Sequence, residues 1–188
     1  MPADNAQALI AYAKKNPDKL SYASSGNGAS SHLAGILFNK MAGTQIMHIP
    51  YKGTGPALND LLGGQVSMSF TDILTALPYI KAGKLRAIGL ASAQRSEALP
   101  DLPTLSEQGL KGYDVSVFFG IVAPKDTPAD VVNTLNQAFK TALSDPAIKQ
   151  TLHSQGIVEA QDQTPQGLAA FITTCLLYTS PSPRDRQK

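Results

Sequence analysis

Residues 20–41 carry the unit that decides the fold, and they read LSYASSGNGASSHLAGILFNKM. Residues 20–24 alternate in polarity, which is typical of a β-strand. The two glycines of residues 25–28 favour a tight turn. Apolar residues then recur at helical spacing, and the next helix is marked by Leu33, Ile36, Leu37 and Met41. The stretch therefore predicts a strand, a glycine-rich turn and a helix in succession.

The same succession repeats along the next 60 residues. Further strands are predicted over residues 45–50, 66–70 and 85–91. Helices are predicted from Pro56 to Leu62, after a proline suited to a first helical turn, and from a cap at Thr71-Asp72 to residue 83. Strands that alternate with helices indicate an α/β fold with a parallel sheet and right-handed crossovers.

Both ends of this region are predicted to continue in helices. A short helix follows the capping-box spacing at Asp4, and after residue 100 we expect a short helix over 104–108 and a long strand over 113–123 that crosses between two lobes. Helices should then begin near residues 128, 145 and 164. The first of these three should bury an apolar stripe of Val131, Leu135, Ala138, Phe139 and Ala142.

Composition separates the body of the chain from its last 16 residues. The 188 residues are 43% hydrophobic and 16% charged, as in ordinary globular proteins. Residues 173–188 show no helical or strand period and are interpreted as a non-native or disordered tail. They hold three basic residues and one acidic residue, so without them the 16 basic and 14 acidic residues become 13 of each. The net charge of +2 therefore belongs to the tail, and we expect no nucleic-acid partner.

The tail also contains the single cysteine, Cys175, so the body carries no information on redox compartment. No stretch reaches the roughly 18–20 apolar residues of a membrane-spanning helix. Residues 1–16 lack the basic start and apolar middle of a signal peptide.

Polar residues gather where the first three predicted strands end. Because ligands of open α/β sheets bind beyond the carboxyl ends of the strands, we expect the binding residues in three loops. The first loop offers hydroxyls, flexible backbone and a helix N-terminus suited to an anion, the second a cation, and the third a hydroxyl and a carboxylate. The candidates are Ser24, Ser25, Gly26, Gly28, Ala29, Ser30, Ser31 and His32 in the first loop, Lys52 in the second, and Thr71 and Asp72 in the third.

Each candidate also has a purely structural interpretation. Ser30 or Ser31 could serve only as the cap of its helix, and Asp72 is a good helix cap in its own right. Lys52 could be a solvated turn residue. His32 could be a hydrogen-bonding neighbour of the site or a surface residue.

Other chemistries have less support. The G-x-G-x-x pattern from Gly26 ends in serine, and no acidic residue closes the following strand, so a dinucleotide site is weakly supported. The three histidines, His32, His48 and His153, show no paired ligand spacing for a metal. No G-x-S-x-G elbow is present for a serine nucleophile. We therefore expect neither catalysis nor a cofactor, and an α/β enzyme domain that binds a nucleotide or a phosphorylated substrate is the alternative.

Five segments of the chain resemble the receptors of tripartite tricarboxylate transporters, the Bug or TctC-like family. They are YASSGNGASSHLAG (22–35), HIPYKGTGPAL (48–58), DLLGGQV (60–66), IKAGKLRA (80–87) and LPDLPT (99–104). The similarity covers about residues 5–172. It implies a periplasmic-binding-protein-like fold of type II, in which two lobes close on a small carboxylate, and a receptor that delivers this ligand to a membrane permease.

The resemblance also implies how the chain is divided. Residues 1–115 would form the second, ligand-binding lobe, and residues 116–172 the returning part of the first lobe, which is incomplete. The family's export signal and the opening part of its first lobe have no counterpart in the sequence, so we expect a fragment. The resemblance implies a periplasmic, monomeric, non-enzymatic protein, with backbone N–H groups and hydroxyls of the 24–31 loop as carboxylate ligands.

Overall fold

The computed structural model describes residues 2–179, with side chains to residue 174, and divides into two compact units. Unit 1 comprises the chain up to residue 118 together with residues 154–156, and unit 2 comprises residues 119–153 and those from 157 onward. The division falls inside the segment that was predicted to cross between lobes. The assignment of these units to the lobes of a receptor stays a prediction.

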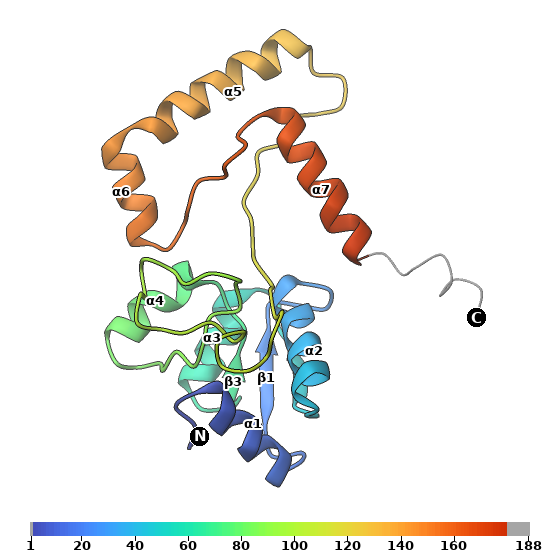
Figure 1. Ribbon diagram of the computed structural model, residues 1–188, viewed down its shortest axis with the longest axis vertical. Helices are drawn as coiled ribbons and strands as arrows, with labels where there is room; N and C mark the ends of the chain where they lie inside the picture. Colours follow the sequence, from blue (N-terminus) through green and yellow to red (C-terminus); the bar gives the residue numbers. More distant parts are fainter. Residues whose placement is uncertain (1, 180–188) are drawn as a thin grey trace, which may run out of the picture. The chain divides into compact units, whose positions relative to one another are not determined.

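Unit 1 is built on a three-stranded parallel sheet in the order β2-β1-β3. Figure 1 labels β1 and β3 of this sheet. Its strands are β1 (Ser21–Ser24), β2 (Met47–Pro50) and β3 (Met68–Ser69). In the register, Tyr22 of β1 lies opposite His48 of β2, and Ala23 lies opposite Ser69 of β3. The α/β fold class predicted from the alternation of strands and helices is confirmed.

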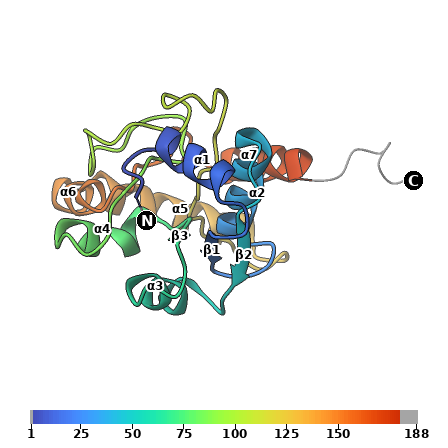
Figure 2. The same ribbon diagram turned by 90° about the horizontal axis from the view of Figure 1, so that it is seen from below.

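Four helices belong to this sheet region: α1 (Ala6–Lys15), α2 (Ser30–Ala42), α3 (Thr54–Leu62) and α4 (Ile73–Lys81). Helices α1 and α2 lie on one side of the sheet and α3 lies on the other (Figure 2). Successive strand residues point to opposite faces. The buried ring of Tyr22 therefore joins the cluster of α1 and α2, while Ala23 packs with Ala57 of α3 and with Val66.

The predicted helix forms as α2, but two of the apolar residues that mark it are exposed. Leu33 and Ile36 are 43% and 48% exposed, and the helix instead buries small residues, Ala34 and Gly35, together with Phe38 and Ala42. The reason is the large Tyr22 ring, which fills the space between strand and helix and admits only a small residue above it.

Two predicted strands and one predicted helix are also absent from the described residues. The segment 85–91 makes a single parallel bridge, between Leu90 and Thr104, and residues 104–108 form turns in place of a helix. Residues 113–123 are not paired into a strand. A strand forms only where a neighbouring strand pairs with its backbone N–H and C=O groups. The apolar composition of these segments predicted burial but could not show whether such a neighbour exists.

Unit 2 contains the helices α5 (Ala129–Ser144), α6 (Pro146–Ser154, whose last residue belongs to unit 1) and α7 (Pro165–Thr179). The amide of Asn136 on α5 donates to the carbonyl of Gln163 at 2.7 Å. The buried stripe predicted for α5 is wrong, because Val131, Leu135 and Phe139 are 42%, 47% and 42% exposed and α5 has no buried residue. Between residues 2 and 179, no helix has both the length and the apolar character needed to cross a bilayer.

Candidate functional site

The first candidate loop closes on itself through two serines. Ser24 ends β1 and is completely buried. The N–H of Ser25 donates to the Ser31 hydroxyl oxygen at 3.0 Å, and the hydroxyl groups of Ser25 and Ser31 also lie 3.0 Å apart. These contacts join the end of the strand to the first turn of α2.

Two glycines give the loop its path. Gly26 and Gly28 have φ angles of 144° and 79°, which L side chains rarely adopt. A side chain at Gly26 would also lie 3.4 Å from the Tyr51 carbonyl oxygen. The N–H of Gly28 donates to Nδ1 of His32 at 3.0 Å, so the imidazole holds the outer part of the loop.

The N-terminus of α2 keeps free donors. Ala29 is its N-cap and provides no capping side chain, so the interpretation of Ser30 or Ser31 as the cap is wrong. In the described part of the chain, the N–H groups of Ser30 and Ser31 make no hydrogen bond to protein atoms. Donors of this kind, at the positive end of a helix dipole, suit an anion.

A stack of three rings supports the loop from inside. Nε2 of His48 lies 2.6 Å from the Ser24 hydroxyl oxygen. The His48 ring stacks on His32, with centroids 4.0 Å apart, and on Tyr22, with centroids 4.9 Å apart. Burial, and secondarily the neighbouring His32, lowers the pKa of His48, which favours its neutral form.

The Ser24–His48 pair has the distance of a serine nucleophile and its base. The hydroxyl of Ser24, however, belongs to a residue with 0% exposure, so no substrate can reach it. It is used inside the loop, where it also accepts from the N–H of Gly26 at 3.3 Å. The geometry therefore favours a structural role for the pair over nucleophilic catalysis.

The second candidate loop lies directly beside the first. The N–H of Tyr51 donates to the Ser24 carbonyl and that of Gly53 to the Ser25 carbonyl, both at 3.0 Å. Lys52 lies between these two anchored positions and is exposed. The prediction that both loops meet at one edge of the sheet is confirmed by the parallel register.

The third loop also follows this edge, but its carboxylate has a capping role. Asp72 is the N-cap of α4, and its Oδ1 accepts from the N–H and the hydroxyl of Thr75 at 2.9 and 2.8 Å. The hydroxyl groups of Thr71 and Thr75 lie 3.3 Å apart. The structural interpretation of Asp72 therefore holds, and a ligand contact by Thr71 or Asp72 stays a prediction.

The sequence prediction missed two contributors, Tyr22 and His48. The polarity alternation of β1 and β2 was the available signal, because it puts Tyr22 and Ser24 on one face. Only the strand register shows that His48 lies opposite Tyr22 on that face. Among residues 2–174, no group of three or more histidine, cysteine or acidic side chains is placed to hold a metal ion.

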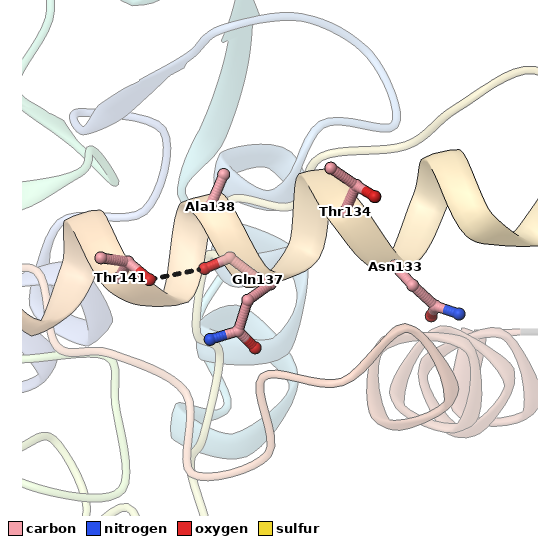
Figure 3. A pocket seen from close by; sticks show the side chains of 5 residues that line it. All are labelled: Asn133, Thr134, Gln137, Ala138 and Thr141. Atoms are coloured by element: carbon pink, nitrogen blue, oxygen red, sulfur yellow. Dashed lines mark hydrogen bonds between the residues drawn. The ribbon is translucent and has the colours of Figure 1, made fainter.

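A separate open hollow lies along α5 in unit 2 (Figure 3). Its lining comes from one helix and carries amide, hydroxyl and methyl groups but no charge: Asn133, Thr134, Gln137, Ala138 and Thr141. The Thr141 hydroxyl is already bound to the Gln137 carbonyl at 2.9 Å. The hollow lacks the convergent polar groups of a ligand site.

Comparison with known sequences identifies the family. The family described as tripartite tricarboxylate transporter family receptor, TctC, matches residues 1–177. The chain belongs to the TctC receptor family. It spans about half the length of most of the curated relatives it matches.

Several solved structures superimpose closely on this chain. An R. palustris protein with adipate has a TM-score of 0.88 and 31% identity over 93% of this chain and 58% of its own. The periplasmic binding protein BugD has a TM-score of 0.83 and 38% identity, with the same coverage. MatC from Rhodopseudomonas palustris with bound malate has a TM-score of 0.82 and 31% identity over 92% of this chain and 60% of its own. The TctC chain described here thus has the fold of periplasmic binding proteins.

Proposed function

We propose that the whole protein containing this chain is an extracytoplasmic receptor that captures a small carboxylate for a tripartite tricarboxylate-type transporter. The observation that carries the proposal is the loop at residues 24–31, where free N–H donors and hydroxyls converge at the start of α2. Family members of the same fold hold adipate and malate, which are both dicarboxylates.

The loop has the chemistry that a carboxylate needs. A carboxylate accepts several hydrogen bonds, and charge-assisted bonds of this kind are roughly twice as strong as neutral ones. The N–H groups of Ser30 and Ser31 would donate to its oxygens, and whichever hydroxyl of Ser25 and Ser31 does not donate to the other would add one further donor. Lys52, exposed beside the loop, would attract the anion through its charge.

The remaining parts of the proposal follow from family membership. The receptor would act in the periplasm, as a monomer, and would deliver its ligand to the membrane permease of the transporter. It would supply affinity without chemical turnover. In support of this, the loop holds donors and no exposed nucleophile with an adjacent base.

Thermal-shift measurements on the full-length protein test the carboxylate ligand. A ligand that binds only the folded state raises the melting temperature as its concentration increases above Kd. We expect a shift with dicarboxylates or tricarboxylates, and a smaller one for Ser31→Ala. The control Ser116→Ala, an exposed serine of the same unit, should respond as the unmodified protein does. A shift with nucleotides and none with any carboxylate would favour the enzyme alternative.

The 188-residue chain alone should bind carboxylates much more weakly than the full-length protein. In a two-lobed receptor, closure removes water from the ligand and adds contacts from the opposing lobe, and the chain spans about half of its curated relatives. Calorimetry on the chain alone measures this directly. Micromolar or tighter binding would contradict the proposal that a second half completes the site.

A further inference from the structure

The stacked histidines occupy an unusual place, because each is tied to the backbone or side chain of the same loop. His32 accepts the Gly28 N–H through Nδ1, so in the neutral ring the proton sits on Nε2. His48 contacts the Ser24 hydroxyl, which in turn accepts the N–H of Gly26. The two imidazoles, 4.0 Å apart, thus reach both glycines of the loop.

We propose that His48 and His32 are positioning residues for the carboxylate loop, which they hold in place as neutral rings and release when they are protonated. The inference rests on the proposed function and adds a regulation by pH to the same site. Neither residue needs to touch the ligand for this effect.

Protonation would change each hydrogen bond in turn. A proton on Nδ1 of His32 removes the acceptor of the Gly28 N–H and turns it into a donor facing a donor. In the neutral tautomer whose Nε2 accepts from the Ser24 hydroxyl, a proton on Nε2 makes this nitrogen a donor to Ser24, and the Ser24 hydrogen then turns to the Gly26 carbonyl, 3.2 Å away. Both glycine positions are therefore coupled to the charge of the rings.

The surroundings favour the neutral rings. The titratable groups that face His48 are His32 on α2 and Tyr22 on β1. Within the described residues, neither imidazole has a hydrogen bond or ion pair with an aspartate, glutamate, lysine or arginine side chain. No carboxylate is thus in place to stabilise an imidazolium, and two stacked imidazoliums would repel each other.

The direction of the pH effect follows from the lowered pKa of His48. An unfolded histidine titrates near pH 6.5. Above that pH both states are neutral and the contribution of His48 to stability is complete. As the pH falls from about 6.5 toward the lower folded-state value, the unfolded chain takes up the proton first, and this stability is lost.

NMR titration of the 188-residue chain tests the positioning role without any ligand. We expect the Gly26 amide and the His48 ring to shift with one common midpoint below pH 6.5. In His48→Gln the pH dependence of the Gly26 amide shift should disappear. The control His153→Gln, in unit 2, should leave the Gly26 and His48 titrations unchanged.

Two results would overturn the inference. One is a Gly26 amide whose chemical shift does not change between pH 7.5 and 5, or changes with a midpoint unrelated to that of the His48 ring signals. This comparison uses the unmodified chain and is independent of how well a variant folds. The other is a Gly26 titration that persists unchanged in His48→Gln.

Calorimetry with malate and adipate on the full-length protein extends the test to binding. One pH unit below the shared midpoint, about a tenth of the loops remain competent, so Kd should rise roughly tenfold in the unmodified protein. The double variant His32→Gln/His48→Gln should lose much less affinity, and the protonation of the ligand itself cancels in this comparison. An equal loss of affinity in the unmodified protein and the variant, or tighter binding at acidic pH, would contradict the proposed regulation by pH. Absence of binding at every pH, with the Gly26 titration intact, would refute the proposed function alone.

Discussion

Replacing Gly35 by alanine should destabilise unit 1, because this glycine lies directly against the buried ring of Tyr22. A Cβ at position 35 would overlap ring atoms of Tyr22 and lie 2.7 Å from its hydroxyl oxygen. The ring cannot move aside easily, since it is 1% exposed and contacts both His48 and Phe70. Overpacking of this kind costs roughly 1–3 kcal/mol.

The helix propensity of alanine opposes this cost by about 0.5–1 kcal/mol. Taking the upper part of the overpacking range, the net loss is about 2 kcal/mol, or about 1 M in the urea midpoint at a typical m-value of 2 kcal/mol/M. The assay is urea unfolding of the 188-residue chain. Gly55→Ala is the matched control, because Gly55 lies in α3 with open space around it and should gain stability.

A double-mutant cycle separates the clash from other effects of the substitution. In a Tyr22→Val background the ring is gone, so Gly35→Ala should cost much less than it does alone. An unchanged or raised midpoint for Gly35→Ala in the otherwise unmodified chain would refute the reasoning about the packing of α2.

Three further substitutions test other parts of unit 1. Tyr113→Phe should cost about 1–3 kcal/mol in urea unfolding, because the buried hydroxyl donates to the Ala34 carbonyl at 2.8 Å; an unchanged midpoint would contradict the bond. Asp72→Ala should cost about 1 kcal/mol by loss of the α4 cap, and Asp72→Asn should cost less. Hydrogen bonding to Arg95 lowers the pKa of Glu107, so its contribution is present above its ordinary pKa and lost as the pH falls through the lowered value. The difference in melting temperature between Glu107→Gln and the unmodified chain should therefore vanish in acid.

Local features of the fold were predictable from the sequence. The alternation of residues 20–24, the glycine-rich turn and the helical spacing after it are short-range signals, and each forms the expected element within a few residues. The shared edge of the loops also follows, because parallel strands that alternate with helices must end on one side of the sheet.

Features that depend on distant partners were not predictable. The role of His48 requires the register between β1 and β2, which the pattern of either strand alone does not contain. Which residues α2 buries depends on the size of Tyr22, because its ring decides which residues can approach the strand. The stripe predicted for α5 is not buried, because burial depends on the elements that pack against a helix and not on the pattern of the helix alone.

The carboxylate-receptor proposal is tested most directly by calorimetric titration of the full-length protein with a panel of dicarboxylates and tricarboxylates at pH 7.5. We expect saturable binding of at least one of these acids, weakened by Ser31→Ala and unaffected by Ser116→Ala. No heat of binding with any acid of the panel, or binding that Ser31→Ala leaves unchanged, would contradict it.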